Sequence, residues 1–130
     1  MQPDGVVGGV TVGDLSLALV QRGRVGETQL IPASWIADVA DPPAASIAAF
    51  AAAPDADTRP TKGYRSAFWV VEPGRSFSAS GIFGQGCYVD LEHDLVVARL
   101  SSAPEALSEE RRAEAMNAIG ALVARLEVTS

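Results

Sequence analysis

The chain has 130 residues, a net charge of −6 and an apolar fraction of 48%. This length suits one domain, and the apolar fraction, with a mean hydropathy of +0.16, excludes a chain that is mainly disordered. Binding to a nucleic-acid backbone needs clustered Lys and Arg, which the negative charge argues against. The basic pair Arg111-Arg112 follows Glu109 and Glu110, which indicates a solvated helix face. We expect no nucleic-acid partner.

Cysteine usage and hydropathy set the expected compartment. Cys87 is the sole cysteine, which rules out an internal disulfide. Its place in an apolar strand predicts a small buried side chain rather than a reactive thiol. No apolar run reaches the roughly 18 residues needed to cross a bilayer, and the N-terminus lacks the basic region of a signal peptide. We therefore expect a cytoplasmic protein without a membrane partner.

Two helices are predicted in the first third of the chain. The segment Thr11-Val12-Gly13-Asp14 resembles a capping box, so a first helix should run to about Arg22 and end at Gly23. A second helix should follow Pro32 and end at Pro42-Pro43. The apolar positions expected to face the core are Leu15, Ala18 and Leu19 in the first helix and Trp35, Ile36 and Val39 in the second.

The middle of the chain is rich in alanine. Residues 44–53 include Ile47 and Phe50 three positions apart, so a short helix and an ordered loop both remain open. The prolines and aspartates that follow are typical of a loop. We expect one partial domain over residues 1–130 with a mobile loop around residues 44–62.

The hydrophobic period changes to two after Gly63. Four strands are predicted, at residues 64–71, 77–80, 87–91 and 95–98, with turns at Pro73-Gly74 and at Glu92-His93-Asp94. His93 is interpreted as a solvated turn residue. The last strand is apolar at successive positions, which is typical of a strand covered on both faces.

A final helix is predicted after Ser108, with Glu109 and Glu110 in a first turn that favours negative charge. Its apolar stripe consists of Met116, Ile119, Leu122, Val123 and Leu126. The predicted fold is therefore α+β: an antiparallel meander of about four strands, two N-terminal helices, and a C-terminal helix packed on the sheet.

The residue patterns of common catalytic and metal sites are missing from the sequence. It contains no CxxC, HExxH, Walker, GxGxxG or GxSxG pattern. Lys62 is the sole lysine and Arg59 stands three positions before it, so no Ser-x-x-Lys pair exists. We expect no metal and no cofactor.

The segment Ser80-Gly81-Ile82-Phe83-Gly84-Gln85, followed by Tyr88-Val89-Asp90 and Leu95-Val96-Val97, resembles the C-terminal part of β-lactamase-related serine hydrolases. Among these it is most similar to the 6-aminohexanoate-dimer hydrolases and related esterases. Three further stretches resemble the same family in the same order. They are Gly8-Gly9 before Asp14-Leu15, the run Leu30 to Ile36, and Gly63-Tyr64 ahead of Trp69-Val70-Val71.

The resemblance implies a fold and a site. The implied fold is the C-terminal portion of the β-lactamase/transpeptidase-like fold, and the family's nucleophilic serine, lysine and tyrosine would lie before Met1. The family's strand-edge element matches Ala79-Ser80-Gly81, with Ala79 at the position of its Lys or His. The residue after the glycine would give a backbone N–H to the oxyanion hole, which makes Ser80, Gly81 and Ile82 the candidate remnant of an oxyanion or substrate-edge site.

Three functions follow from these observations. The first is a C-terminal fragment or subunit of a serine hydrolase that acts on amide or ester bonds and is inactive alone. The second is a non-catalytic oligomeric binding or assembly module derived from that fold. The third is an active enzyme that uses Ser80 or Cys87. The expected partner is a second copy of the chain or a separately encoded N-terminal half.

Overall fold

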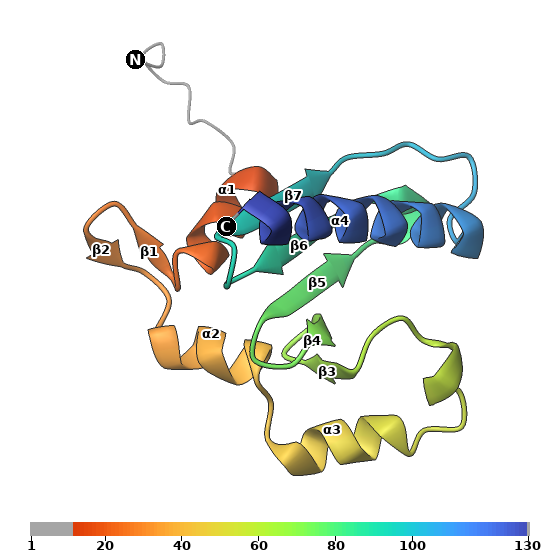
Figure 1. Cartoon of the computed structure of the whole chain (residues 1–130), viewed down its shortest axis with the longest axis horizontal. Coiled ribbons are helices and arrows are strands. Elements are labelled where there is room, and N and C mark those ends of the chain that lie inside the picture. The colour runs from red at the N-terminus through yellow and green to blue at the C-terminus, as the bar shows by residue number, and fades with distance from the viewer. Residues whose placement is uncertain (1–11, 130) are drawn as a thin grey trace.

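The computed structural model describes residues 12–129 and has an α+β fold (Figure 1). Strands β3–β7 form one antiparallel five-stranded sheet whose spatial order follows the sequence, and β1 and β2 form a separate hairpin. The predicted class and meander are confirmed, with five strands instead of about four. In chain order the elements are α1 (Val12–Val20), β1 (Arg24–Val25), β2 (Thr28–Gln29), α2 (Ala33–Ala40), α3 (Ala44–Ala51), η1 (Ala56–Thr58), β3 (Gly63–Arg65), β4 (Phe68–Glu72), β5 (Ser76–Ser80), η2 (Ile82–Gly84), β6 (Gly86–Asp90), β7 (Leu95–Arg99) and α4 (Glu109–Thr129).

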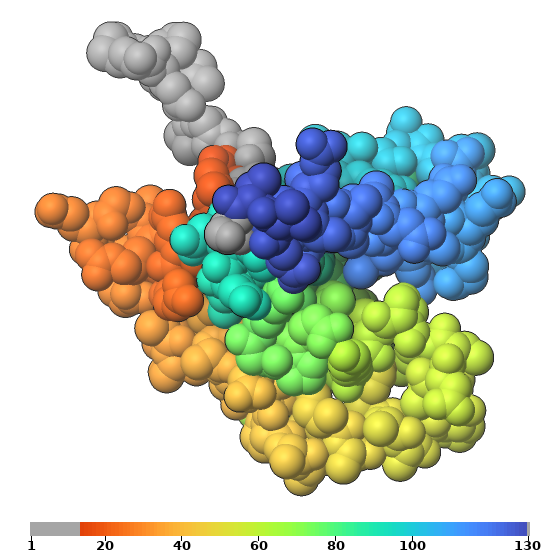
Figure 2. All heavy atoms as spheres, in the orientation of Figure 1, coloured from red at the N-terminus to blue at the C-terminus, as the bar shows by residue number. Residues whose placement is uncertain are grey.

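Helices cover both faces of the sheet. The register aligns Phe77 with Val89 and Val89 with Val96, and Phe77 and Val89 pack against α1 and α2. The period of two in a strand places Ser78 and Tyr88 on the opposite face, which α4 crosses (Figures 1 and 2). The buried core consists of Leu19, Val20, Ile36, Val39, Ala40, Phe77 and Val89.

Helix α1 ends where the sequence predicts a stop, and its buried face matches the predicted one only in part. Gly23 has φ +85° and donates its N–H to Ala18 O at 2.8 Å. A Cβ at Gly23 would collide with the carbonyl oxygen of Ile31, so glycine is needed there. Leu15 is 44% exposed, and between residues 14 and 20 the buried side chains are those of Ser16, Leu19 and Val20. The prediction is therefore wrong for Leu15 and confirmed for Leu19, while Ala18 is half-buried. The predicted cap Thr11 lies outside the described residues.

Helices α2 and α3 follow the proline signals. Pro32 and Pro43 are the N-caps of α2 and α3, which begin at the next residues. Ile36 and Val39 are buried as predicted, and Trp35 contacts Phe68 edge-on with a centroid distance of 6.2 Å. The helical alternative for residues 44–53 is confirmed. The mobility expected around residues 44–62 stays a prediction.

The predicted strand at residues 64–71 is wrong because the chain reverses in its middle. Ser66 and Ala67 both have positive φ, 50° and 71°, and they connect β3 to β4. Turns of this kind favour Asn or Gly at both positions. The sequence therefore carries no hairpin signal at this point, and the pattern predicts a single strand where the structure has β3 and β4.

Helix α4 lies over the sheet without burying any of its own residues. At its first turn the Nη1 of Arg99 donates to Arg111 O at 3.4 Å, and at its last turn the Nη2 of Arg75 contacts the Oε1 of Glu127 at 3.0 Å. Between these contacts the predicted stripe is half-buried, and Leu122 is 41% exposed. The predicted position of the C-terminal helix over the sheet is therefore confirmed, but the helix buries none of its residues.

No helix in the described part of the chain combines the length and apolarity that crossing a membrane requires.

Candidate functional site

The three candidate site residues lie together at one end of β5. Ser80 is the last residue of the strand, and Gly81 continues it in extended conformation with φ −109° and ψ 169°. The Gly81 N–H donates to Gln85 O at 3.0 Å, which closes the bend between β5 and β6. Ile82 begins the turn η2 and its side chain is 54% exposed. The Gly81 N–H is therefore engaged within the bend.

The bend after Ile82 holds a strained residue. Phe83 has φ 59° and ψ 24°, a left-handed conformation that a bulky side chain rarely adopts. Its N–H donates to Ala106 O at 2.8 Å, and its carbonyl accepts the Ala103 N–H at 3.2 Å. Such conformations persist when neighbouring structure fixes them, and they cluster at functional sites. The segment that leads to α4 therefore fixes the shape of this bend.

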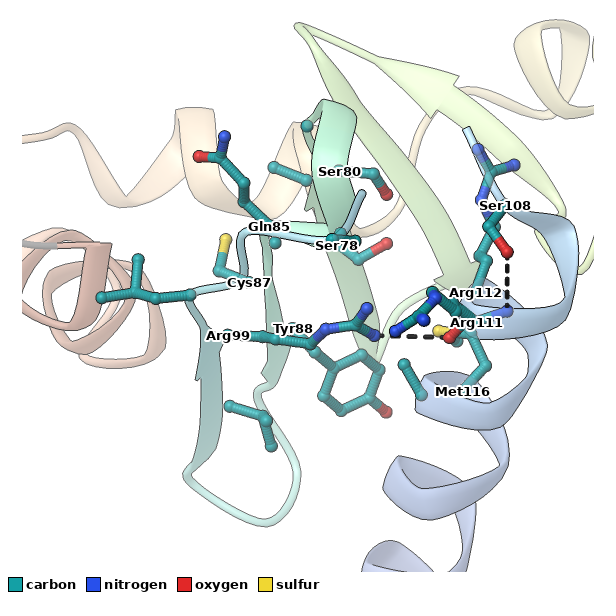
Figure 3. Close-up of a pocket in the computed structure, with 18 of the residues that line it drawn as sticks. Ser78, Ser80, Gln85, Cys87, Tyr88, Arg99, Ser108, Arg111, Arg112 and Met116 are labelled. Carbon is teal, nitrogen blue, oxygen red and sulfur yellow. Dashed lines mark hydrogen bonds between the residues drawn. The ribbon is translucent and has the colours of Figure 1, made fainter. Parts of the chain in front are cut away.

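No attacking group with a base lies beside the strand end in residues 12–129. Ser80 pairs with Gly86 at one end of β6, whereas His93 follows Asp90 at the other end of that strand. The Lys62 ammonium pairs with Glu72 at 2.6 Å. Cys87 is buried, as predicted, and Figure 3 shows its thiol pointing away from the Ser78 hydroxyl and Arg99.

A cluster of polar contacts surrounds Asp90, whose side chain is fully buried. Its Oδ1 accepts the N–H groups of Glu92 and His93 at 3.0 and 3.1 Å. Its Oδ2 accepts the Arg75 Nε–H at 3.1 Å and lies 3.2 Å from His93 Nδ1. Only 11% of the His93 side chain is exposed, so its interpretation as a solvated turn residue is wrong. Asp90, the last residue of β6, therefore holds the His93 side chain in a mostly buried position.

Burial and hydrogen bonding act in opposite directions on Asp90. Burial alone would raise the pKa of its carboxyl group, but hydrogen bonds from His93 and Arg75 outweigh burial and hold that pKa below 3.8. Burial raises the pKa of the neighbouring Tyr88 phenol, whose hydroxyl lies 3.5 Å from Asp90 Oδ2. The charged carboxylate is therefore the native form, and this cluster fixes the turn between β6 and β7.

A cavity of about 480 Å³ lies between α4 and strands β5–β7 (Figure 3). We call it the α4 cavity. Its polar lining includes the hydroxyls of Ser78 and Ser80 and the arginines Arg99, Arg111 and Arg112. The sequence analysis placed Arg111-Arg112 on a solvated face, and both residues are exposed, but they also border this cavity. Arg99 was overlooked, since only the strand register brings it opposite the first turn of α4.

Within residues 12–129, no group of three or more His, Cys, Asp or Glu side chains could hold a metal ion. No protein-family model matches the chain, and no curated protein matches it either.

Proposed function

We propose that the chain is the C-terminal part of a β-lactamase-related serine hydrolase that acts on amide or ester bonds, similar to the 6-aminohexanoate-dimer hydrolases, and that it is inactive alone. The observation that carries the proposal is the strand end at Ser80-Gly81-Ile82. It combines an extended glycine with a strained, well-held bend, yet no nucleophile with a base lies beside it in the described chain. A site of this kind positions a carbonyl group and leaves the attack to another polypeptide segment.

The free edge of the sheet supports a missing partner. Strand β7 is the last strand in the sheet order and pairs only with β6 among the described strands. It carries Leu95, Val96 and Val97 in succession, and an apolar edge strand is a template for pairing with another chain. The separate N-terminal half would add its own strand here and bring the serine and lysine of a Ser-x-x-Lys pair.

Alone, the purified chain should hydrolyse a p-nitrophenyl ester at the rate of buffer, and Ser80→Ala should change nothing, because no base activates Ser80 or Cys87. Adding an N-terminal half of a related hydrolase that carries Ser-x-x-Lys should produce hydrolysis that disappears when its nucleophilic serine is replaced. Turnover by the chain alone contradicts the proposal, and so does a mixture that stays inactive.

The Ile82 N–H can be tested in the same mixture. Ile82→Pro removes the N–H, and the extended conformation of Gly81 is one that precedes proline readily. Loss of one oxyanion donor should lower kcat by about 100-fold. The matched control Ile82→Val keeps the N–H and should retain nearly full activity. Equal activities of the two variants would remove Ile82 from the site.

The second candidate function is a non-catalytic oligomeric assembly module, and the exposed apolar side chains favour it. Leu100 is 78% exposed, Leu107 is 69% exposed and Val128 is 87% exposed, all in or next to β7 and α4. Leu107 and Val128 lie at opposite ends of α4, so these are separate exposed apolar side chains, and together with a free strand edge they favour self-association. The expected result of size-exclusion chromatography with light scattering is a dimer or larger species. A monomer at all concentrations would eliminate the assembly module.

A further inference from the structure

We propose that the α4 cavity binds an amphipathic organic anion, a carboxylate on a short aliphatic chain, with the carboxylate held by Arg99 and Arg111. This inference does not require the proposed hydrolase ancestry, because it rests on the residues between α4 and the sheet, although Ser80 and Gly81 of the strand end also line the cavity.

The first argument is uncompensated positive charge. Neither Arg99 nor Arg111 forms an ion pair with a carboxylate in residues 12–129, although the chain as a whole is acidic. The Arg99 Nη1 contacts the Arg111 carbonyl at 3.4 Å, so its guanidinium lies at the first turn of α4. Arg112 pairs with Glu109 at 3.4 Å, and Glu105 also lines the cavity without an ion pair. The cavity lining therefore holds three arginines and one carboxylate, and a bound anion would offset this excess of positive charge.

The second argument is a hydroxyl group in the cavity wall, that of Ser78, which is open to the cavity and can donate a hydrogen bond. Ser78 is only 8% exposed, and its side chain makes no hydrogen bond to any residue the structure describes. Figure 3 shows the Ser78 hydroxyl pointing from β5 toward α4, on the same side of the sheet as Arg99. A carboxylate oxygen in the cavity would accept the hydrogen bond that Ser78 can donate.

The remaining lining decides the rest of the ligand. The rest of the cavity lining is mainly apolar and includes the side chains of Val97, Leu107, Met116 and Ile119. A volume of about 480 Å³ falls within the range of about 300 to 1,000 Å³ typical of small-molecule sites. Arginine presents a fork of donors that matches a carboxylate. A charged head with an aliphatic tail therefore fits this lining better than a bare inorganic anion.

The test is titration of the purified chain with octanoate by isothermal calorimetry. We expect saturable one-to-one binding with Kd below about 1 mM. Arg99→Gln and Arg111→Gln should each weaken it by about tenfold, the usual loss for a charge-assisted hydrogen bond. Arg111 makes no side-chain hydrogen bond or ion pair within residues 12–129, so Arg111→Gln keeps the fold and carries the test even if Arg99→Gln destabilises it.

Arg125→Gln is the matched control, because Arg125 is an exposed arginine of α4 outside the cavity lining and its loss changes the net charge equally. Octanoate affinity should be unchanged in this variant. Any of four results would overturn the proposal: no saturable binding of octanoate, equal affinity for octanol, equal affinity for inorganic phosphate, or an equal loss of affinity in Arg125→Gln.

Discussion

Asp90→Asn should lower the free energy of unfolding at pH 7 by about 3 kcal/mol, the scale for breaking a buried charged pair. The substitution keeps the side-chain volume but replaces one carboxylate oxygen by an NH₂ group. An NH₂ group is a donor, so it cannot accept the hydrogen bonds that the lost oxygen accepted. Arg75 and His93 then lose a buried acceptor at 3.1 and 3.2 Å. Urea denaturation followed by circular dichroism measures the difference.

The matched control for this variant lies in the same turn. Asp94 is exposed and has φ 48°, a conformation in which asparagine is well tolerated. Asp94→Asn should therefore change the free energy of unfolding by less than about 0.5 kcal/mol. If both variants lose the same stability, the effect comes from net charge and not from the buried cluster.

The pH dependence of the same variant has a definite sign. The folded-state pKa of Asp90 lies below its ordinary value of 3.8, so the unfolded chain binds the proton more tightly. The contribution of Asp90 is complete above the unfolded pKa and is lost as the pH falls through the lower folded pKa. The gap between the native chain and Asp90→Asn should therefore be widest near pH 7 and narrow below pH 3.8. A constant gap would contradict the charged state assigned to Asp90.

Phe77→Ala should cost about 4 kcal/mol, because the ring is fully buried between the sheet and helices α1 and α2. The ring also contacts Phe68 edge-on with a centroid distance of 5.3 Å, a contact that the smaller side chain loses. Thermal and urea unfolding should both show the loss. Leu30→Ala is the control, since Leu30 is exposed and should cost less than about 0.5 kcal/mol. Similar losses of unfolding free energy in Phe77→Ala and Leu30→Ala would contradict the assignment of Phe77 to the buried core.

The sequence predicts much of the fold because its signals are local. Pro32 and Pro43 mark the starts of two helices, Gly23 marks a stop, and alternation marks β5 and β6. The split of residues 64–71 into β3 and β4 was not predictable in this way. It depends on positive φ at Ser66 and Ala67, residue types that rarely adopt it. The surrounding sheet, rather than the turn residues, therefore specifies this reversal.

The site was predictable only where it is contiguous in the chain. Ser80, Gly81 and Ile82 stand next to each other, so their place at a strand end could be expected from the sequence. The α4 cavity joins Ser78 and Arg99 to the first turn of α4, and only the register and the path of residues 100–108 bring these together. The Asp90 cluster left one local signal, an aspartate just before a turn, which commonly accepts backbone N–H groups two and three residues ahead.

The strictly sequential order of the sheet bears on how this polypeptide reaches its native state. Each of the strands β3–β7 pairs with its neighbours along the chain, so every pairing step closes a short loop and loses little conformational entropy. Low contact order of this kind favours rapid folding. The sheet can therefore assemble hairpin by hairpin from its own residues, without waiting for a template from any other chain. A piece of an enzyme made separately would need that kinetic independence before meeting its other half.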